Sequence, residues 1–420
     1  MKDAADLART SYLASFAEGP GYLDFARVGP MSRRVIGARN AAAEALLTPG
    51  PATVDTLMQA GPAGVRAAAA VAGLPAAAIA YVPNTSTGLF QVAFALTAAG
   101  PRTEILIGAD EFPSNTYPWA RAHAAGRLEP AWLRTGGVGV TPELLAERIT
   151  ERTAAVSVSA VDFRSGRTID LAAVRSILGN RLLIVDAIQA FGAVAMDWSL
   201  ADAVIVGGQK WLRSGWGTGF VAVSDRLADR WDPLLAGWTA VERVVEYDGR
   251  LHPTVPGAGS LSITNLSPID QAAFLAGLEL VQSVGVPWIQ ARIADIAGRL
   301  AGRLRDIGAV VAAGRPDAGI VPFRLPDAPM EKVHRTLTAA GIACTWHADR
   351  IRLSVHATTT VESIDLVCAA VEDARRLLRR GDRPEPDVGR PPEVPVDAAA
   401  GPTSRPARRA VSAAVSDNES

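Results

Sequence analysis

Two short apolar runs set the fold class of this chain: Leu182-Leu183-Ile184-Val185-Asp186 and Ala203-Val204-Ile205-Val206-Gly207. Each has the length and the β-branched content of a buried strand. Similar runs recur between longer amphipathic stretches rich in Ala, Leu and Arg, at residues 79–82, 104–108, 154–160 and 219–223. This alternation is typical of βα units. The sequence therefore predicts an α/β domain with a mainly parallel central sheet and helices on both faces.

The 420 residues divide by composition. An N-terminal segment (1–20) precedes the predicted large domain (21–266). Residues 267–380 start with a long helical pattern, interrupted near Gly285, and continue with short strands, a helix and a hairpin, which predicts a smaller α+β C-terminal domain. Residues 381–420 hold seven of the 28 prolines and no aromatic, Leu, Ile or Met residue, so we expect a disordered Pro-rich tail.

Charge and cysteine content exclude several function classes. The chain has 42 basic and 43 acidic residues, whereas proteins that bind nucleic acid or anionic membranes need a basic surface. Cys344 and Cys368 lack metal-ligand spacing and are too few for a disulfide framework, which favours a reducing cytoplasm and no metal. No apolar run reaches the roughly 18 to 20 residues of a spanning helix, and no secretory signal is readable at the start.

Polar residues follow both opening runs, where parallel sheets bind their ligands. Asp186 ends the first run, Gln189 lies three residues later, and Lys210 follows the second run, 24 residues beyond Asp186. Together they match what pyridoxal phosphate requires: a lysine for the Schiff base, a carboxylate for the pyridine nitrogen, and a donor for the phenolic oxygen. Taken singly, they read as a helix N-cap, a loop amide and a surface lysine.

Lysine is rare in this chain, which singles out Lys210. It occurs only at Lys2, Lys210 and Lys332, while arginine fills the other basic positions. A GC-rich genome would produce the same bias. Arginine cannot lose its proton near neutral pH, however, whereas a desolvated lysine becomes a nucleophilic amine.

The stretches Val185–Ala190 and Gly207–Trp211 resemble the signature of class V aminotransferase-fold enzymes, which include cysteine desulfurases, kynureninases, isopenicillin N epimerase-like proteins and C–S lyases. Weaker motifs extend the resemblance from about residue 22 to residue 371. It implies the fold type I of pyridoxal 5'-phosphate-dependent transferases. It also implies that Lys210 is the Schiff-base lysine, Asp186 the pyridinium partner and Gln189 the contact to the phenolic oxygen.

The run Asn84-Thr85-Ser86-Thr87-Gly88 resembles the phosphate turn of this family. Thr85 and Ser86 would supply hydroxyls, and the start of a helix supplies free N–H groups and the positive end of its dipole. The same run also reads as an ordinary N-cap cluster. Gln209 falls where relatives place a His or Gln near the phosphate.

Two further positions resemble the cofactor contacts of relatives. Phe112 falls where the family stacks a His or an aromatic ring, although a core aromatic is the alternative. The stretches Val161–Gly166 and Gly237-Trp238 resemble kynureninase, but relatives commonly carry Asn at the position of Asp162. An acid there would add negative charge near the phenolate and alter substrate recognition, which argues against kynureninase activity itself.

The resemblance also implies a second subunit and a substrate anchor. Gly257–Ser260 resembles the segment that lends a hydroxyl to the neighbouring subunit's phosphate, so Ser260 would complete the partner's site in a homodimer; a Gly-rich turn is the alternative. Arg352 matches the arginine that binds the substrate α-carboxylate, for which a planar fork is suited. Arg350 and a solvent-exposed position for Arg352 are the alternatives.

Cys344 bears on the reaction type. Desulfurases carry a nucleophilic cysteine on a loop before the arginine strand, but here residues 341–347 run almost directly into that strand. We therefore expect Cys344 to be a core residue of the hairpin, which disfavours desulfurase chemistry. His347 is either a surface residue or a substrate contact.

These observations favour a pyridoxal 5'-phosphate enzyme that acts on an L-amino acid through an external aldimine and a Cα carbanion, with Lys210 as the base. The kynureninase-like stretches favour Cβ cleavage, as in a C–S β-lyase or a kynureninase-like enzyme with a cysteine-conjugate-like substrate. Class V aminotransferase activity remains the alternative. An NAD(P)-dependent oxidoreductase lacks its Gly-x-Gly-x-x-Gly turn, and Lys210, Asp186 and Arg352 argue against a silent binding homologue.

Overall fold

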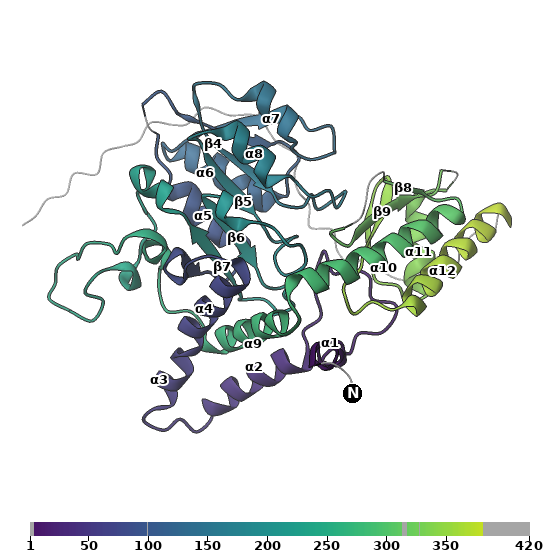
Figure 1. Ribbon diagram of the computed structural model, residues 1–420, viewed down its shortest axis with the longest axis horizontal. Helices are drawn as coiled ribbons and strands as arrows, with labels where there is room; N and C mark the ends of the chain where they lie inside the picture. Colours follow the sequence, from purple (N-terminus) through teal and green to yellow (C-terminus); the bar gives the residue numbers. More distant parts are fainter. Residues whose placement is uncertain (1–3, 99, 313–316, 327, 381–420) are drawn as a thin grey trace, which may run out of the picture. The chain divides into compact units, whose positions relative to one another are not determined.

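The computed structural model describes residues 4–98, 100–312, 317–326 and 328–380 (Figure 1). Residues up to 380 form one compact unit. The tail predicted to be disordered, 381–420, lies outside the described residues. The strands of the described part form one large and one small sheet.

The large sheet has the order β1-β7-β6-β5-β4-β2-β3. Strands β2 to β6 are parallel, and β7 runs antiparallel to both β6 and β1. The strands are β1 (Ile79–Tyr81), β2 (Glu104–Gly108), β3 (Glu129–Leu133), β4 (Thr153–Ser159), β5 (Leu182–Asp186), β6 (Ala203–Gly207) and β7 (Gly219–Val223). The predicted mainly parallel sheet is confirmed.

Strand β3 was not predicted. It lies at the sheet edge, pairs only with β2, and leaves most of its residues partly or fully exposed. Glu129 and Pro130 weaken its strand signal, since proline is tolerated only where no ladder hydrogen bond is needed. An edge strand of this kind therefore lacks the buried apolar run by which the inner strands were recognised.

Helices cover both faces of the large sheet because successive strand residues point to opposite sides. Leu183 and Val185 of β5 pack in one core, whereas Leu182 and Ile184 pack in another. The first core also contains side chains of α4 (Ala60–Ala72), α8 (Leu171–Leu178) and α9 (Pro268–Val284). The second contains side chains of α5 (Thr85–Ala95) and α6 (Tyr117–Ala124). Other helices here are α1 (Ala4–Ala14), α2 (Arg33–Ala45), α3 (Thr53–Met58) and α7 (Pro142–Arg148).

The small sheet has its own core and the antiparallel order β10-β11-β9-β8. Its elements follow the predicted order of a helical stretch, short strands, a helix and a hairpin. They are α10 (Val286–Asp306), β8 (Val310–Val311), β9 (Ile320–Arg324), α11 (Met330–Ala339), β10 (Thr345–His347), β11 (Arg350–Ser354) and α12 (Val361–Arg380). The domain boundary at residue 266 stays a prediction, because residues 1–380 form one unit.

Residues just after the N-terminal segment join the small sheet, although the sequence assigned them to the large domain. Tyr22 bridges to Ala343, and Asp24 bridges to Ser354. Leu23 is buried in the core of the small sheet. The paired residues are more than 300 positions apart in the sequence, so no local sequence pattern predicts these pairings.

Gly285 (φ 79°) separates α9 from α10, and the two helices are bent by 80°. Among the described residues, no single helix has the length and apolar character needed to cross a membrane, and only this bent pair meets that criterion when taken together.

Candidate active site

A cavity of about 440 Å³ gathers most of the predicted site residues. It opens where β5 and β6 end, and residues of the small sheet line its other side. The predicted residues that line it are Thr85, Ser86, Phe112, Asp186, Gln189, Gln209, Lys210 and Arg352. A larger cavity of about 590 Å³, near Arg167 and Ile320, contains none of them.

Lys210 and Asp186 are both buried in this cavity. Burial lowers the pKa of Lys210 to about 8, although the nearby Asp186 opposes that shift. Burial also raises the pKa of Asp186 to about 6, against the hydrogen bond that Ile188 N–H donates and the charge of Lys210. The amine is therefore partly neutral near physiological pH, as a nucleophile requires.

Close backbone packing holds the lysine loop. Gly29 N–H donates to Gln209 O (2.8 Å), and Gly208 N–H donates to Thr218 O (2.8 Å). A Cβ atom at Gly29 would lie 2.1 Å from Lys210 O. Only glycine permits this approach, so the chain after the N-terminal segment fixes the position of Lys210.

The start of α5 provides a cradle for an anion. Asn84 caps the helix by accepting a hydrogen bond from Thr87 N–H (2.8 Å). Thr85 Oγ1 is buried without a hydrogen-bond partner in the described structure. A Cβ at Gly207 would lie 2.6 Å from Thr85 Oγ1 and 2.6 Å from Gln209 Oε1, so the glycine keeps space beside these groups. Together with the helix N-terminus, this arrangement fits a phosphate.

Gln189 lines the cavity, but its amide is held by the protein. Its Nε2 donates to Ala26 O (2.9 Å), and its Oε1 accepts from Trp211 Nε1 (2.9 Å). The second amide N–H has no partner among these bonds. The contact of Gln189 with a phenolic oxygen stays a prediction that uses this remaining donor.

Two aromatic rings form one wall of the cavity. The Phe112 ring centroid lies 5.5 Å from Lys210 Nζ. The Phe163 ring meets Phe112 edge to face at a centroid distance of 5.3 Å. Phe112 is partly exposed rather than a core aromatic, and its stacking on the cofactor stays a prediction.

Arg352 enters the cavity from β11 and is nearly fully buried. Its NH1 donates to Phe163 O (2.8 Å), and its NH2 donates to Thr345 Oγ1 (3.0 Å) and lies 3.6 Å from Asp24 Oδ1. Its Nε has no partner among the described residues. Arg350, the alternative, pairs with Asp349 and does not line the cavity.

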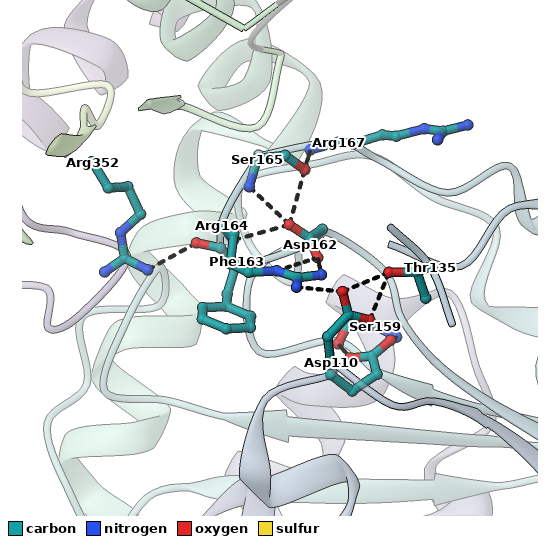
Figure 2. Close-up of polar contacts among 10 residues, drawn as sticks. Asp110, Thr135, Ser159, Asp162, Phe163, Arg164, Ser165, Arg167 and Arg352 are labelled. Carbon is teal, nitrogen blue, oxygen red and sulfur yellow. Dashed lines mark hydrogen bonds and ion pairs between the residues drawn. The ribbon is translucent and has the colours of Figure 1, made fainter. Parts of the chain in front are cut away.

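Two predicted site residues do not reach the cavity. Asp162 lines a separate cavity of about 210 Å³, and its carboxylate is bound by Arg164 and Ser165 (Figure 2). Ser260 is buried within its own chain, where Trp231 Nε1 donates to its hydroxyl (2.9 Å) and the hydroxyl donates to Gly257 O (2.7 Å). Local partners therefore satisfy both side chains, and the role of Ser260 in a partner's site stays a prediction.

Sequence reasoning missed Arg27 and Ser114 and left His347 undecided. All three line the Lys210 cavity. Ser114 follows Phe112 closely and donates to or accepts from Ser86 Oγ (2.8 Å), so its place in the motif was a usable signal. Burial and the nearby guanidinium of Arg352 lower the pKa of His347, and its Nε2 has no partner in the described structure.

Cys344 is a buried core residue of the small domain, as predicted. Burial raises the pKa of its thiol to about 12, and Asp24 adds to this shift. Cys344 does not line the Lys210 cavity. A thiol kept protonated in this way cannot serve as a nucleophile at neutral pH.

Comparison with known proteins identifies related sequences. The family model for aminotransferase class-V matches residues 63–366. The kynureninase of Deinococcus radiodurans is 30% identical over 216 residues, covering 49% of this chain and 51% of the relative. The kynureninase of Myxococcus xanthus is 28% identical over 47% of this chain and 50% of the relative. A probable cysteine desulfurase of Borreliella burgdorferi is 27% identical over 34% and 35%. The chain spans about half the length, or less, of these curated relatives.

Solved structures share the fold. The cystine C–S lyase C-DES, in complex with its product cysteine persulfide, superposes with a TM-score of 0.76 at 21% identity, covering 84% of this chain and 97% of that one. The cysteine desulfurase CsdA from Escherichia coli gives a TM-score of 0.76 at 19% identity, covering 88% and 98%. The fold is thus that of pyridoxal phosphate-dependent fold type I.

The residues of the cavity fit this cofactor. A buried amine, a carboxylate at the end of β5 and an unpaired hydroxyl at a helix N-terminus line one cavity. Their chemistry corresponds to the aldehyde, ring nitrogen and phosphate of pyridoxal 5'-phosphate. The chain belongs to the aminotransferase class-V family of pyridoxal 5'-phosphate-dependent enzymes.

Proposed function

We propose that this protein is a lyase that cleaves a Cβ bond of an L-amino acid, with a substrate resembling a cysteine S-conjugate. The observation that carries the proposal is the convergence of Lys210, Asp186, Thr85 and Arg352 on one cavity. The matches to kynureninases favour Cβ cleavage over other outcomes. The buried Cys344 argues against a persulfide-forming cysteine at the site.

Bound pyridoxal 5'-phosphate supplies an electron sink that stabilises negative charge at the substrate Cα. Asp186 would balance the positive charge of the ring nitrogen, and the cradle at α5 would hold the phosphate. Arg352 binds the α-carboxylate. Lys210, once its amine is free, removes the Cα proton, for which its lowered pKa is suited. Phe112 and Phe163 line the cavity beside Lys210.

Transfer of the amino group to a keto acid is the alternative outcome, because the same residues would perform its first steps. The two reactions differ in their products. A lyase acting on a cysteine S-conjugate releases pyruvate, ammonia and a thiol, whereas an aminotransferase converts the cofactor to pyridoxamine 5'-phosphate.

The experiment incubates purified holoenzyme with L-kynurenine, a panel of cysteine S-conjugates and L-alanine. We expect pyruvate and ammonia to form from an S-conjugate, and we expect the Lys210→Ala variant to lose this activity. Borohydride reduction followed by peptide mass spectrometry should locate the cofactor on Lys210. Stoichiometric pyridoxamine 5'-phosphate would instead support the aminotransferase, and a cofactor attached elsewhere would refute the assignment of Lys210.

The protein is also proposed to be a homodimer. Segment 234–251 carries the exposed apolar side chains Leu234, Leu235, Val245, Tyr247 and Leu251. Exposed apolar side chains are common at protein interfaces, and a second copy of this chain would cover these. Ser260 lies close to this segment in sequence, which is compatible with a role near the interface.

A further inference from the structure

We infer that Asp162, Arg164 and Asp110 form an ionic clamp that positions Arg352 for the substrate carboxylate, so that Asp162 is a positioning residue and not a cofactor contact. The inference rests on the proposed role of Arg352. It follows from four adjoining contacts that connect the ends of β2 and β4 to strands β9 and β11 of the small sheet.

The first contact is the clamp itself (Figure 2). Arg164 NH1 donates to Asp110 Oδ2 (2.5 Å), and Arg164 NH2 donates to Asp162 Oδ2 (2.8 Å). The side chains of Arg164 and Asp162 are only 16% and 10% exposed. Thr135 Oγ1 donates to Asp110 (2.6 Å) and fixes its carboxylate. A guanidinium shared by two carboxylates in this way is held in one orientation.

The second contact is a set of hydrogen bonds that fixes the turn containing Asp162 and Arg164. Asp162 Oδ1 accepts hydrogen bonds from Arg164 N–H (3.0 Å) and Ser165 N–H (2.8 Å), and Gly166 N–H donates to Asp162 O (2.9 Å). These hydrogen bonds hold residues 162–166 in a tight turn, and Phe163 is one of the residues within this turn. Such a turn leaves the Phe163 backbone little freedom.

A third contact joins this turn to the small domain. Gly166 has φ 73°, and a Cβ there would lie 2.8 Å from Ile320 O of β9. A positive φ and this close approach both require glycine. The turn is therefore seated against the same sheet that carries Arg352.

The fourth contact reaches Arg352. The Phe163 carbonyl, held by the turn, accepts from Arg352 NH1 (2.8 Å), while Thr345 holds NH2. Figure 2 shows Arg352 extending toward Phe163, with the clamp on the other side of the turn. The guanidinium is thus fixed at both terminal nitrogens, and NH1 keeps a second N–H, not used in these bonds, that a carboxylate can accept. Preorganisation of this kind lowers the cost of binding.

The charges support an ionic clamp at neutral pH. Burial opposes the charge of Arg164, but its two carboxylate partners raise its pKa. Burial likewise opposes ionisation of Asp110, yet the hydrogen bond from Thr135 and the charge of Arg164 lower its pKa. Because Asp110 and Asp162 neutralise Arg164, that guanidinium does not compete with Arg352 for the substrate.

The test compares Asp162→Asn and Arg164→Met with a matched control. Asparagine keeps the carbonyl oxygen that caps the turn but removes the charge that binds Arg164. The control is Arg175→Met. The guanidinium of Arg175 pairs with the buried Asp202 (2.9 Å), which precedes β6 and so lies at the other end of the strands from the cavity. Thermal unfolding of each holoenzyme checks that the variants are folded.

The readouts are the dissociation constants of propionate and of its amide, propionamide, measured by calorimetry on the holoenzyme, together with KM and kcat for the substrate. Both clamp variants should weaken propionate binding and raise KM roughly tenfold, with kcat little changed, because the guanidinium is misplaced. Propionamide binding and cofactor affinity of the clamp variants should match wild type. The Arg175→Met variant should keep the wild-type propionate affinity and KM. In an Arg352→Lys background, Asp162→Asn should have no further effect on propionate.

Three outcomes would overturn the inference. Unchanged propionate binding in folded clamp variants would show that Phe163 needs no clamp. Loss of cofactor affinity in Asp162→Asn would make Asp162 a cofactor residue after all. If the wild type itself binds propionate no better than propionamide, the role of Arg352 fails, and the proposed function fails with it.

Discussion

At the scale of single residues, the pKa of Lys210 reflects two opposing effects. Burial favours the neutral amine, and the carboxylate of Asp186 favours the ammonium ion. Burial is the larger effect, so the pKa falls from 10.5 to about 8. The charge of Asp186 makes this fall in the pKa of Lys210 smaller but does not cancel it. The same acid is thus available to a cationic ring nitrogen while the lysine remains a usable nucleophile.

This balance predicts the pH dependence of cofactor attachment. Only the neutral amine reacts with the aldehyde, so the rate of chromophore formation from apoprotein and pyridoxal 5'-phosphate should rise with pH through a midpoint near 8. Asp186→Asn removes the charge that raises the pKa of Lys210, and the midpoint should move to lower pH. Stopped-flow absorbance measures both. A midpoint near 10.5 in the wild type would contradict the effect of burial.

At the scale of elements, one strand serves both the core and the active site. Ile351 and Leu353 of β11 are buried in the small-domain core. Arg352 and Ser354 alternate with them and face the other way. Arg352 reaches the cavity, and Ser354 Oγ accepts from Ala26 N–H (2.8 Å). Packing of the apolar residues therefore sets the direction of Arg352, the proposed substrate anchor.

A second prediction concerns the contact between residue 29 and the lysine loop. Gly29→Ala would place a Cβ against Lys210 O and push the loop away, at a cost of roughly 1–3 kcal/mol of unfolding free energy. Cofactor affinity should fall as well. Gly37→Ala is the control, because a Cβ there meets no atom within 4 Å and the position is inside α2. Denaturant unfolding and cofactor titration measure the two variants, and equal behaviour would argue against the close contact.

At the scale of the whole molecule, the buried Arg213 joins three regions. Its NH2 donates to Glu18 of the N-terminal segment (2.5 Å), its Nε donates to Pro30 O (2.6 Å), and its NH1 donates to Thr358 Oγ1 beyond β11 (3.0 Å). Arg213 lies three residues after Lys210 and adopts φ 55°. A guanidinium held from several sides ties the lysine loop to the N-terminal segment and to the loop after β11.

Glu18→Gln should therefore destabilise the protein by about 3 kcal/mol, because a buried guanidinium loses its acid partner. Although burial raises the pKa of Glu18, Arg213 and Thr358 lower it below its ordinary 4.5 overall. This stabilisation is present above that pH and is lost as the pH falls through the folded-state pKa. Urea unfolding should thus show a difference between wild type and variant at pH 7 that shrinks below about 4.5. Asp295→Asn, in an exposed pair with Arg299, should cost under about 0.5 kcal/mol.

The proposed dimer makes a separate prediction. Light scattering should give twice the mass of the 420-residue chain. Tyr247→Glu and Leu251→Glu should shift the protein toward monomer, because each places a charge on the exposed apolar segment. Leu377→Glu, at an exposed position of α12, is the control and should leave the mass unchanged. A monomeric wild type would refute the proposal.

The inner strands of the large sheet and the main residues of the cavity could be predicted from the amino-acid sequence alone. Buried strands carry continuous apolar runs, so β5 and β6 were recognisable, and β5 pairs with β6 in parallel. Adjacent parallel strands end at the same edge, which brings Asp186 and Lys210 together without further information. The hairpin of β10 and β11 was predicted as well, although its register comes from the structure.

The sequence could not show which polar side chains share the cavity and which are hydrogen-bonded elsewhere; the folded structure shows this. Asp162 is bound by Arg164, Ser260 by Trp231, and His347 and Arg27 line the cavity although neither has a distinctive motif. The edge strand β3 likewise has no recognisable strand pattern in its sequence. The reason is physical: these placements depend on packing between residues far apart along the chain, and such packing leaves no periodic pattern in the local sequence.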